Sequence, residues 1–349
     1  MDLDPSIWKG QRVLITGHTG FKGSWLSLIL KEFGAHVVGY SLPPKTSPSL
    51  YQLANIQSDL EREIFGDVTS YSELHDFFSS CNLDYVFHLA AQPLVRQSVL
   101  NPLETINTNV MGTANTLRIA LQSRRLKGVT IATTDKVYRN IGDDSAFREN
   151  DSLGGRDPYS ASKAAAELIV AAFDSTLNPL DIPLTTVRAG NVIGGGDWGS
   201  ERLIPDLIKA INSDQILYVR NPESTRPWQY ILDCLRGYLL VAQNHLTNEI
   251  PNPKSVNFGP AESLSVSRVL KLFQDVFEKQ IEIKVEASSI IEHQYLRLNS
   301  QFALMQYGWE PALSVEESIY RTARWYSDFD RGSDPRTLML KEIGDLWDA

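Results

Sequence analysis

Short apolar runs alternate with longer helical patterns along the first half of the chain. A short apolar run bounded by turn residues predicts a buried strand, and apolar residues spaced three or four apart predict a helix. Regular alternation of the two is typical of βα units, which build a parallel sheet with helices on both faces. The predicted strands are 12–16, 35–40, 85–91, 129–133 and 184–189, and the predicted helices are 22–33, 70–81, 102–125 and 158–173.

The pattern changes after Gly190, where a Gly-rich loop at 194–196 is followed by shorter elements. No Pro- or Ser-rich linker separates the two halves, so we expect one continuous body with a cleft. We predict a doubly wound parallel α/β sheet in residues 1–189 and a smaller lobe in residues 190–349, with segments near 229–260 returning to pack on the sheet. The polar C-terminal tail is expected to be an appendage. The elements predicted in this half are a strand at 216–220 and helices near 203–212, 229–245 and 264–279.

The composition is that of an ordinary globular protein, and it narrows the possible partners. Of 349 residues, 42% are hydrophobic and 21% charged, and 33 Lys and Arg against 42 Asp and Glu give a net charge of −9. This acidic balance argues against nucleic-acid binding, because phosphate backbones attract clustered Lys and Arg. It leaves room for a small phosphorylated ligand, which needs only one or two local cations.

Cysteine content and the absence of long apolar runs bear on the cell compartment. Cys81 and Cys234 are too few and too far apart for a disulfide framework or a cysteine metal site, so we expect a reduced, cytoplasmic environment. No apolar run approaches the roughly 20 residues that a membrane helix needs. The acidic residues at 1–5 do not resemble a signal peptide. We therefore expect neither a membrane partner nor secretion, and no cluster of His, Asp and Glu suggests a metal.

A glycine-rich turn between the first strand and the first helix is the strongest candidate binding site. Gly17, Gly20 and Gly23 are three residues apart and directly follow the strand. Glycines there let the backbone turn tightly and approach a pyrophosphate, which the N-terminus of the next helix stabilises. An ordinary βα turn is the alternative, but the strand before and the helix after it favour a dinucleotide site. The residues assigned to this site are Gly17, Thr19, Gly20, Phe21, Lys22 and Gly23.

The acidic residue expected at the end of the second strand is absent. It would hold the adenosine ribose about 20 residues after the glycines, but residues 40–43 of this chain are YSLP. The lack of an arginine there argues against NADP, whose 2′-phosphate needs a cation, and favours NAD. Asp67, which with Val68 ends another short predicted strand, has two interpretations: an acceptor for the adenine amino group or a helix-entry aspartate.

Tyr159 and Lys163 are four residues apart in a predicted helix and so lie on one face. A free phenol has a pKa of about 10 and is no base at neutral pH. A neighbouring ammonium favours the phenolate and lowers that pKa toward the working range. In isolation the pattern fits a half-buried tyrosine beside a solvated lysine equally well. Its position downstream of a dinucleotide turn favours catalysis.

A polar run ends the predicted strand 129–133, at the sheet edge where ligands bind in open α/β folds. The hydroxyl of Thr134 is placed to share a hydrogen bond with a substrate alcohol and with the tyrosine. Asp135 and Lys136 follow directly, so one can donate a proton while the other removes one. A surface ion pair, which contributes little to stability, is an equally good interpretation of these two residues alone.

Together these sites resemble those of the extended short-chain dehydrogenases/reductases that modify nucleotide sugars, which share the three-and-three glycine spacing. Within that group the chain is similar to the CDP-glucose 4,6-dehydratases from about Trp8 to Trp325. The most specific feature is the pair Asp135-Lys136, because dTDP-glucose dehydratases have Asp-Glu there and 4-epimerases lack such a pair. The matching segments are HTGFKGSWLSL (18–28), HLAAQPLVRQS (88–98), NTNVMGT (107–113), TTDKVY (133–138), DPYSASKAAAE (157–167), RAGNVIGGGDW (188–198), RLIPD (202–206) and RPWQ (226–229).

The resemblance implies a Rossmann-like domain that binds NAD and a smaller C-terminal lobe that binds the nucleotide sugar. It assigns Thr134, Tyr159 and Lys163 to hydride transfer, and the Asp135-Lys136 pair to dehydration. The implied activity is conversion of CDP-glucose to CDP-4-keto-6-deoxyglucose by internal hydride transfer through bound NAD. The product would serve deoxysugar synthesis for surface polysaccharides such as O-antigen.

The resemblance also implies binding residues outside the glycine turn. Asn109 would support a proton relay to Lys163, with a helix cap as the alternative, and Arg188 would lie near the nicotinamide and the sugar. A guanidinium suits phosphate because its planar fork binds two oxygens, although each such arginine alone is more often a solvated surface residue. The cofactor residues added are Asp67, Val68, Ala90, Ala91, Gln92 and Asn109 together with Tyr159 and Lys163, and the substrate residues are Gln92, Arg96, Asn191, Arg202, Leu203 and Arg226.

Two other functions remain as alternatives. One is a related enzyme, either a dTDP- or GDP-sugar 4,6-dehydratase or a nucleotide-sugar 4-epimerase. The other is an NAD-sensing protein without chemistry, which would be free to discard Tyr159 and Lys163. We also expect a homodimer, because the helices at 102–125 and 158–173 carry more apolar side chains than one sheet face covers.

Overall fold

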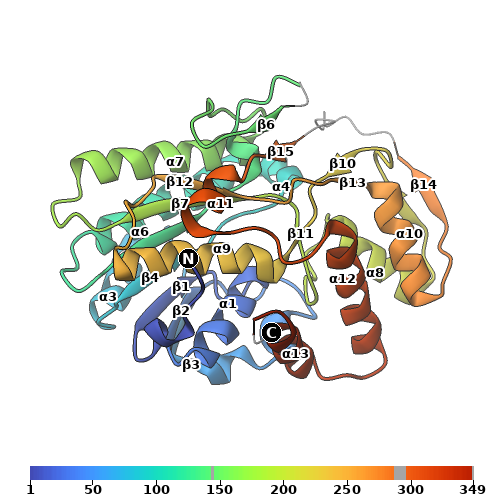
Figure 1. The fold of residues 1–349 in the computed structure, drawn as a ribbon, viewed down its shortest axis with the longest axis horizontal. Coiled ribbons are helices and arrows are strands. Elements are labelled where there is room, and N and C mark those ends of the chain that lie inside the picture. Colours follow the sequence, from blue (N-terminus) through green and yellow to red (C-terminus); the bar gives the residue numbers. More distant parts are fainter. Residues whose placement is uncertain (143–144, 287–295, 348–349) are drawn as a thin grey trace.

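The computed structural model describes residues 1–142, 145–286 and 296–347 (Figure 1). Seven parallel strands form one sheet in the order β12-β7-β5-β4-β1-β2-β3. The order reverses between β1 and β4, which is where open α/β sheets leave a crevice for ligands. The strands are β1 (Arg12–Thr16), β2 (His36–Ser41), β3 (Leu60–Phe65), β4 (Tyr85–His88), β5 (Val129–Ala132), β7 (Leu184–Ala189) and β12 (Ser255–Phe258).

Helices follow most strands of the sheet, and the rest of the chain adds shorter elements. The helices are α1 (Phe21–Glu32), α2 (Leu50–Leu53), α3 (Tyr71–Ser79), α4 (Val95–Leu100), α5 (Pro102–Ile106), α6 (Gly112–Ala120), α7 (Pro158–Thr176), α8 (Leu203–Ser213), α9 (Ile231–Thr247), α10 (Val266–Phe277), α11 (Gln301–Tyr307), α12 (Val315–Asp330) and α13 (Pro335–Trp347). The short strands are β6 (Ala146–Phe147), β8 (Val192–Ile193), β9 (Leu217–Val219), β10 (Thr225–Arg226), β11 (Gln229–Tyr230), β13 (Leu264–Ser265), β14 (Ile283–Val285) and β15 (Arg297–Leu298).

Two apolar cores lie on opposite faces of the sheet, because successive strand residues point to opposite sides. In β1, Val13 and Ile15 pack in the core that includes α1 and α9. Leu14, between them, packs in the other core with α3, α6 and α7. Helices α8, α10 and α12 gather at one end of the molecule, beside the carboxyl ends of the strands (Figure 1). The fold predicted from the sequence, a doubly wound parallel α/β sheet, is confirmed.

Two predicted elements have wrong boundaries. The strand predicted at 85–91 ends at His88, because the chain leaves the sheet to pass over the turn at Gly17. The single helix predicted at 102–125 is interrupted by a π-helical segment, η3 (Asn107–Met111), and α6 ends at Ala120. The apolar pattern continues past Ala120 because Leu121 and Leu126 are buried from a turn. The prediction also missed β12, which lies in the half where the pattern indicated mainly helices.

The C-terminal tail is not an appendage. Helix α13 buries Leu338, Met339 and Ile343 in the main core. At its start Arg336 donates two hydrogen bonds to the Asp59 carboxylate, at 2.6 and 2.7 Å. These contacts tie the end of the chain to the segment between β2 and β3. No helix among the described residues is both long enough and apolar enough to cross a membrane.

We predict that Met339→Ala lowers the free energy of unfolding by about 2–5 kcal/mol, because it removes a fully buried side chain and leaves a cavity. Urea unfolding of the two proteins measures the difference. Met305→Ala is the control, since that methionine is 72% exposed on α11. Equal small losses in both variants would contradict the docking of α13.

Candidate active site

The glycine turn after β1 is shaped for the close approach of a ligand. Gly17 has φ +81°, and a Cβ there would lie 2.8 Å from the Ala90 nitrogen. A Cβ on Gly23 would overlap the Gly17 carbonyl oxygen. Helix α1 begins after Gly20 with no side-chain cap, so its first backbone N–H groups are available to an anion. The turn therefore fits the pyrophosphate of a dinucleotide.

The expected adenosine end of the site contains hydroxyl groups in place of a carboxylate. The Thr19 hydroxyl lies 2.9 Å from the Ser41 hydroxyl and donates to the Leu42 carbonyl. Asp67 follows β3, and its Oδ1 accepts from the Thr69 backbone nitrogen. Val68 is buried against Gly112. The Asp67 carboxylate thus closes a local turn after β3.

A buried network beneath this end was not predicted from the sequence. His18 is buried and its Nε2 lies 2.9 Å from the Glu63 carboxylate, which also accepts from the Tyr51 hydroxyl at 2.7 Å. Burial lowers the pKa of His18 despite the nearby carboxylate. The His18 ring packs over Gly39, where a Cβ would come within 2.7 Å of it. Only the pairing of β3 with β2 brings Glu63 under His18.

The loop after β4 is fixed by amide groups. The Gln92 side chain is buried and bonds the Leu94 backbone within the loop and the Thr105 hydroxyl on α5. Asn109, in the π-helical segment, accepts from the Gln92 nitrogen at 2.8 Å and donates to the Ser162 hydroxyl at 2.9 Å. Asn109 therefore joins this loop to α7. Ala90 and Ala91 lie in the same loop and are half-buried beside the glycine turn.

The acid–base candidates after β5 are in contact with one another. The Thr134 hydroxyl donates to Asp135 Oδ1 at 2.9 Å, and Lys136 Nζ donates to the same oxygen at 3.2 Å. Asp135 is 1% exposed, whereas the Lys136 side chain is 34% exposed. Asp135 Oδ2 is buried and has no hydrogen-bond partner in the part of the chain that the structure describes. A buried oxygen without a partner is suited to accept a hydrogen bond from a ligand.

Tyr159 and Lys163 lie on α7, which begins at Pro158 with Asp157 as its cap. Burial raises the pKa of Tyr159, while the Lys136 charge and a hydrogen bond with Thr134 oppose that rise. The cation that acts most strongly on Tyr159 here is Lys136, whereas the spacing along the helix suggested Lys163. Lys163 instead donates to the Ala132 carbonyl at 3.0 Å. Burial and the charge of Lys22 lower the pKa of Lys163 to about 8.

The protonation of Lys136 follows from its neighbours. Burial lowers its pKa, but attraction to Asp135 and Tyr159 outweighs burial, so the pKa of Lys136 is raised. Arg226 acts in the opposite direction at this site. In this arrangement Lys136 is therefore an ammonium at neutral pH and is paired with Asp135. It becomes a base only after it has given up its proton.

Several predicted substrate residues come from the C-terminal half and reach the same region. Arg202 directly precedes α8 and Leu203, and its guanidinium bonds the Asp197 carboxylate at 2.8 and 2.9 Å. Asp197 is the main cause of its raised pKa, and the charge of Arg202 acts in turn on Tyr159. Arg96 of α4 lies 3.7 Å from Glu201. The structure thus brings Arg202 near Tyr159 and Arg226 near Lys136. Arg96 lies beside Glu201, the residue that precedes Arg202.

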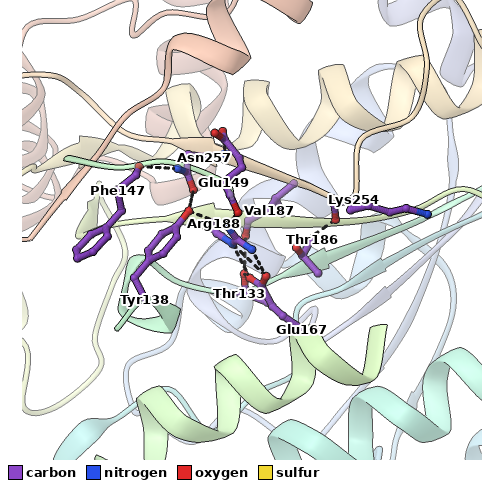
Figure 2. Close-up of polar contacts among 10 residues, drawn as sticks. All are labelled: Thr133, Tyr138, Phe147, Glu149, Glu167, Thr186, Val187, Arg188, Lys254 and Asn257. Carbon is purple, nitrogen blue, oxygen red and sulfur yellow. Dashed lines mark hydrogen bonds and ion pairs between the residues drawn. The ribbon is translucent and has the colours of Figure 1, made fainter. Parts of the chain in front are cut away.

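Arg188 in strand β7 and Asn191 just after this strand lie in different surroundings. Arg188 was expected near the nicotinamide and the sugar, but it is 4% exposed and its guanidinium is bonded to Glu167, Tyr138 and the Glu149 carbonyl. Figure 2 shows these side chains meeting inside the protein. Asn191 lies just beyond β7, half-buried, with its carbonyl accepting from the Gln229 nitrogen. The Arg188 guanidinium therefore binds groups of the protein itself.

Sequence reasoning missed the partners of Arg188. In the sequence, Glu167 and Tyr138 stand out only as the last residues of two of the matching segments, 157–167 and 133–138. The repeat of positions 159, 163 and 167 along one helix face was a usable signal for Glu167. No local pattern signals that Tyr138 and Asn257 meet, since they are 119 positions apart. Within the described ranges no group of three His, Cys, Asp or Glu side chains could hold a metal ion.

Three features define a member of the extended short-chain dehydrogenase/reductase class. They are the parallel sheet whose strand order reverses between β1 and β4, the glycine turn and the Tyr159–Lys163 pair. Residues 14–322 match the family described as GDP-mannose 4,6 dehydratase, and the chain belongs to that family. The chain is 40% identical to the CDP-glucose 4,6-dehydratase of Salmonella typhimurium, with 99% of each chain covered. The family resemblance predicted from the sequence is thereby confirmed.

Solved structures of other proteins share this fold. The dTDP-glucose 4,6-dehydratase of Streptomyces venezuelae superposes with a TM-score of 0.80 at 23% identity, over 93% of this chain and 100% of that one. The epimerase Mth375 of Methanothermobacter thermautotrophicus gives a TM-score of 0.82 at 22% identity, over 97% of both chains. At these identities the likeness establishes the fold.

We predict that Gly17→Ala destabilises the protein more than Gly10→Ala does. Both glycines have positive φ, +81° and +75°, so alanine carries a similar backbone penalty of about 1–2 kcal/mol at each. Only at Gly17 would the new Cβ also meet the backbone at Ala90, since nothing lies within 4 Å of a Cβ on Gly10. Urea unfolding of both variants measures the difference, and equal losses would contradict the close approach.

Proposed function

We propose that the protein is a CDP-glucose 4,6-dehydratase that converts CDP-glucose to CDP-4-keto-6-deoxyglucose. The observation that carries the proposal is the contact of Asp135 with both Thr134 and Lys136 beside Tyr159. A 4-epimerase needs one acid–base group at C4, whereas a dehydratase also needs an acid and a base at C6 and C5. This chain has both sets of groups. Tyr159 and Thr134 serve C4, and Lys136 and Asp135 serve C5 and C6. The 40% identity to the Salmonella enzyme supports CDP as the nucleotide.

The glycine turn, Thr19, Ser41 and Asp67 are the residues that would hold NAD. The fit rests on the turn itself, where a Cβ on Gly17 or Gly23 would clash with neighbouring backbone, so that only glycine allows a turn this tight before the helix N-terminus. Bound NAD would accept a hydride from C4 and return one to C6. With a proton given back to C5 by Lys136, which removed it, the overall reaction would be loss of water. We propose that residues 1–189 bind this cofactor and residues 190–349 bind the nucleotide sugar.

In the first stage Tyr159 accepts the proton of the C4 hydroxyl, and the Thr134 hydroxyl holds that oxygen in place. The resulting ketone at C4 acidifies the proton on C5. In the second stage Lys136 removes that proton, and Asp135 protonates the C6 hydroxyl as it leaves. Asp135 Oδ2, the buried oxygen with no partner among the described residues, is the atom suited to that hydroxyl.

The second stage requires the proton of the Lys136–Asp135 pair to be on the carboxyl group. Lys136 carries it in this arrangement, since the pKa of Lys136 is raised. The proton can move directly, because Lys136 Nζ and Asp135 Oδ1 are 3.2 Å apart. Positive charge that approaches the site favours this transfer, because it disfavours the ammonium. The two groups therefore titrate as a coupled pair.

Arg202 and Arg226 are the proposed diphosphate ligands. Asp197 holds the Arg202 guanidinium through one of its terminal nitrogens, which leaves the others for phosphate oxygens. The product belongs to the 4-keto-6-deoxy sugars, which supply deoxysugar synthesis for surface polysaccharides such as O-antigen. We place the enzyme in the cytoplasm, in keeping with two cysteines that are both free and buried.

The test is incubation of the purified enzyme with CDP-, dTDP-, UDP- and GDP-glucose, and with GDP-mannose. The 4-keto product absorbs in alkali, and we expect it from CDP-glucose at a rate well above the other substrates. Product from dTDP-glucose alone would reassign the nucleotide. Inversion at C4 with no 4-keto product would identify an epimerase.

We predict that Lys136→Met slows product formation by about 10²-fold or more, the usual loss for one general acid or base. The first oxidation depends on Tyr159 and should slow less than elimination, because Thr134 and Arg202 still oppose the rise of the Tyr159 pKa when Lys136 is lost. Reduced nicotinamide therefore accumulates and is seen by its absorbance after rapid mixing. Lys271→Met, an exposed lysine on α10, is the control for loss of a charge. A wild-type rate in Lys136→Met would make the Asp135–Lys136 contact a simple ion pair.

We also propose a homodimer that forms through α4, α5 and α7. These helices pack together and, with the π-helical segment η3 that follows α5, expose large apolar side chains. A patch of this kind on a protein surface marks an interaction site. Its residues and their exposed fractions are Leu103 (80%), Leu100 (66%), Leu168 (61%), Val99 (52%), Met111 (49%) and Ile106 (44%).

We predict a mass of twice 39.1 kDa by light scattering at micromolar concentration. Leu103→Glu places a charge on the apolar face and shifts the protein toward the monomer, because burial of an unpaired charge is costly. Met305→Glu, at a 72% exposed residue on α11, leaves the mass unchanged. A monomeric wild type would contradict the proposed face.

A further inference from the structure

Arg188 and Glu167 form a buried ion pair next to the acid–base residues. Both side chains are 4% exposed, and the guanidinium donates from Nε and Nη2 to the carboxylate (Figure 2). Removing two charges from water is costly, and a buried pair often contributes no net stability over apolar residues of the same size. The proposed mechanism gives neither residue a chemical role. The pair therefore needs another explanation.

The contacts of this pair lie on either side of the acid–base loop. Thr133, just before Thr134, donates from its hydroxyl to Glu167 Oε1 at 2.7 Å. Tyr138, two residues after Lys136, accepts from Arg188 Nη1 at 2.6 Å through its hydroxyl. The ion pair thus holds both ends of the short loop that carries Thr134, Asp135 and Lys136.

The same pair is fixed to the helix that carries Tyr159 and Lys163. Glu167 lies on α7, four residues after Lys163, so it points to the same side of the helix. On the other side, the Tyr138 hydroxyl donates to Asn257 Oδ1 at 2.7 Å, and Asn257 belongs to the edge strand β12. The contacts therefore run from α7 through β7 to the loop and on to β12.

The chemistry requires this spacing to be constant. One sugar ring must present C4 to Tyr159 on the helix and C5 and C6 to Lys136 and Asp135 on the loop. A shift of about 1 Å between catalytic groups can cost about 10²-fold in rate. Elimination depends on two groups from the loop, whereas oxidation depends mainly on the helix. Loss of the ion pair should therefore affect elimination more.

We propose that Glu167, Arg188 and Tyr138 are positioning residues that set the distance between the oxidation groups on α7 and the Asp135–Lys136 pair. The proposal rests on the proposed dehydratase function. It assigns to these residues a role in rate and not in substrate affinity. Neither Glu167 nor Arg188 exchanges a proton in the reaction.

The first test replaces both charges by apolar groups of similar size in the double variant Glu167→Met/Arg188→Met. We expect thermal stability close to that of the wild type, because no unpaired charge remains. We expect kcat to fall by about tenfold or more while KM for CDP-glucose stays within about threefold, because positioning is lost and the binding residues remain. Reduced nicotinamide should accumulate in the double variant and not in the wild type.

Tyr138→Phe is the second variant, and it decides the matter if the double variant does not fold. It keeps the ion pair and releases only one end of the loop, so we expect kcat to fall about threefold to tenfold with the same accumulation of reduced nicotinamide. Tyr85→Phe is the matched control, since that buried hydroxyl also has two partners, Thr130 and His245, but lies away from the loop. We expect its kcat to be unchanged.

The outcomes separate this proposal from the proposed function. Wild-type kcat in a folded double variant and in Tyr138→Phe would overturn the positioning role. A fall in kcat without accumulation of reduced nicotinamide, or an equal fall in Tyr85→Phe, would also overturn it, because a general structural role would then suffice. Failure of the wild type to form a 4-keto product from CDP-glucose would instead overturn the proposed function.

Discussion

The close contact between the glycine turn and the chain leaving β4 determines the geometry of the whole site. β4 pairs with β1 on one side and with β5 on the other, so their carboxyl ends lie at one edge of the sheet. A Cβ on Gly17 would lie 2.8 Å from the Ala90 nitrogen, and therefore only glycine lets the two segments pass. The cofactor turn, the loop of Gln92 and the Asp135–Lys136 pair depend on that proximity.

Three buried carboxylates at this edge each contact a cation. Asp135 is paired with Lys136, Asp197 with Arg202 and Glu167 with Arg188. Each cation compensates the carboxylate that it contacts, which would be costly to bury alone, and Arg188 is itself buried. Lys163 is different, because it donates to a carbonyl and its pKa falls to about 8. The site therefore combines three paired cations with one buried lysine whose pKa is lowered.

Features that depend on local sequence could be predicted well. The alternation of strands and helices, the glycine spacing and the helix face shared by Tyr159 and Lys163 depend on residues within a few positions of one another. Predictions failed where distant segments decide the outcome. The strand at Tyr85 ends early because Gly17 lies beneath the chain, and the helix after Pro102 contains a π segment in which Asn109 bonds α7 and the loop after β4.

The sequence by itself determined the class of fold and indicated the dinucleotide turn and the candidate acid–base residues, because each is encoded by residue types at short spacing. Tertiary structure alone decided which partner each charge has. Asp135 and Lys136 could have been a solvated ion pair, but packing buries the carboxylate and raises the pKa of Lys136. The family resemblance places Arg188 near the nicotinamide and the sugar, yet Glu167 and Tyr138 bind it inside the protein. The physical reason is that desolvation and charge pairing depend on distances in space, which residue spacing along the chain does not specify.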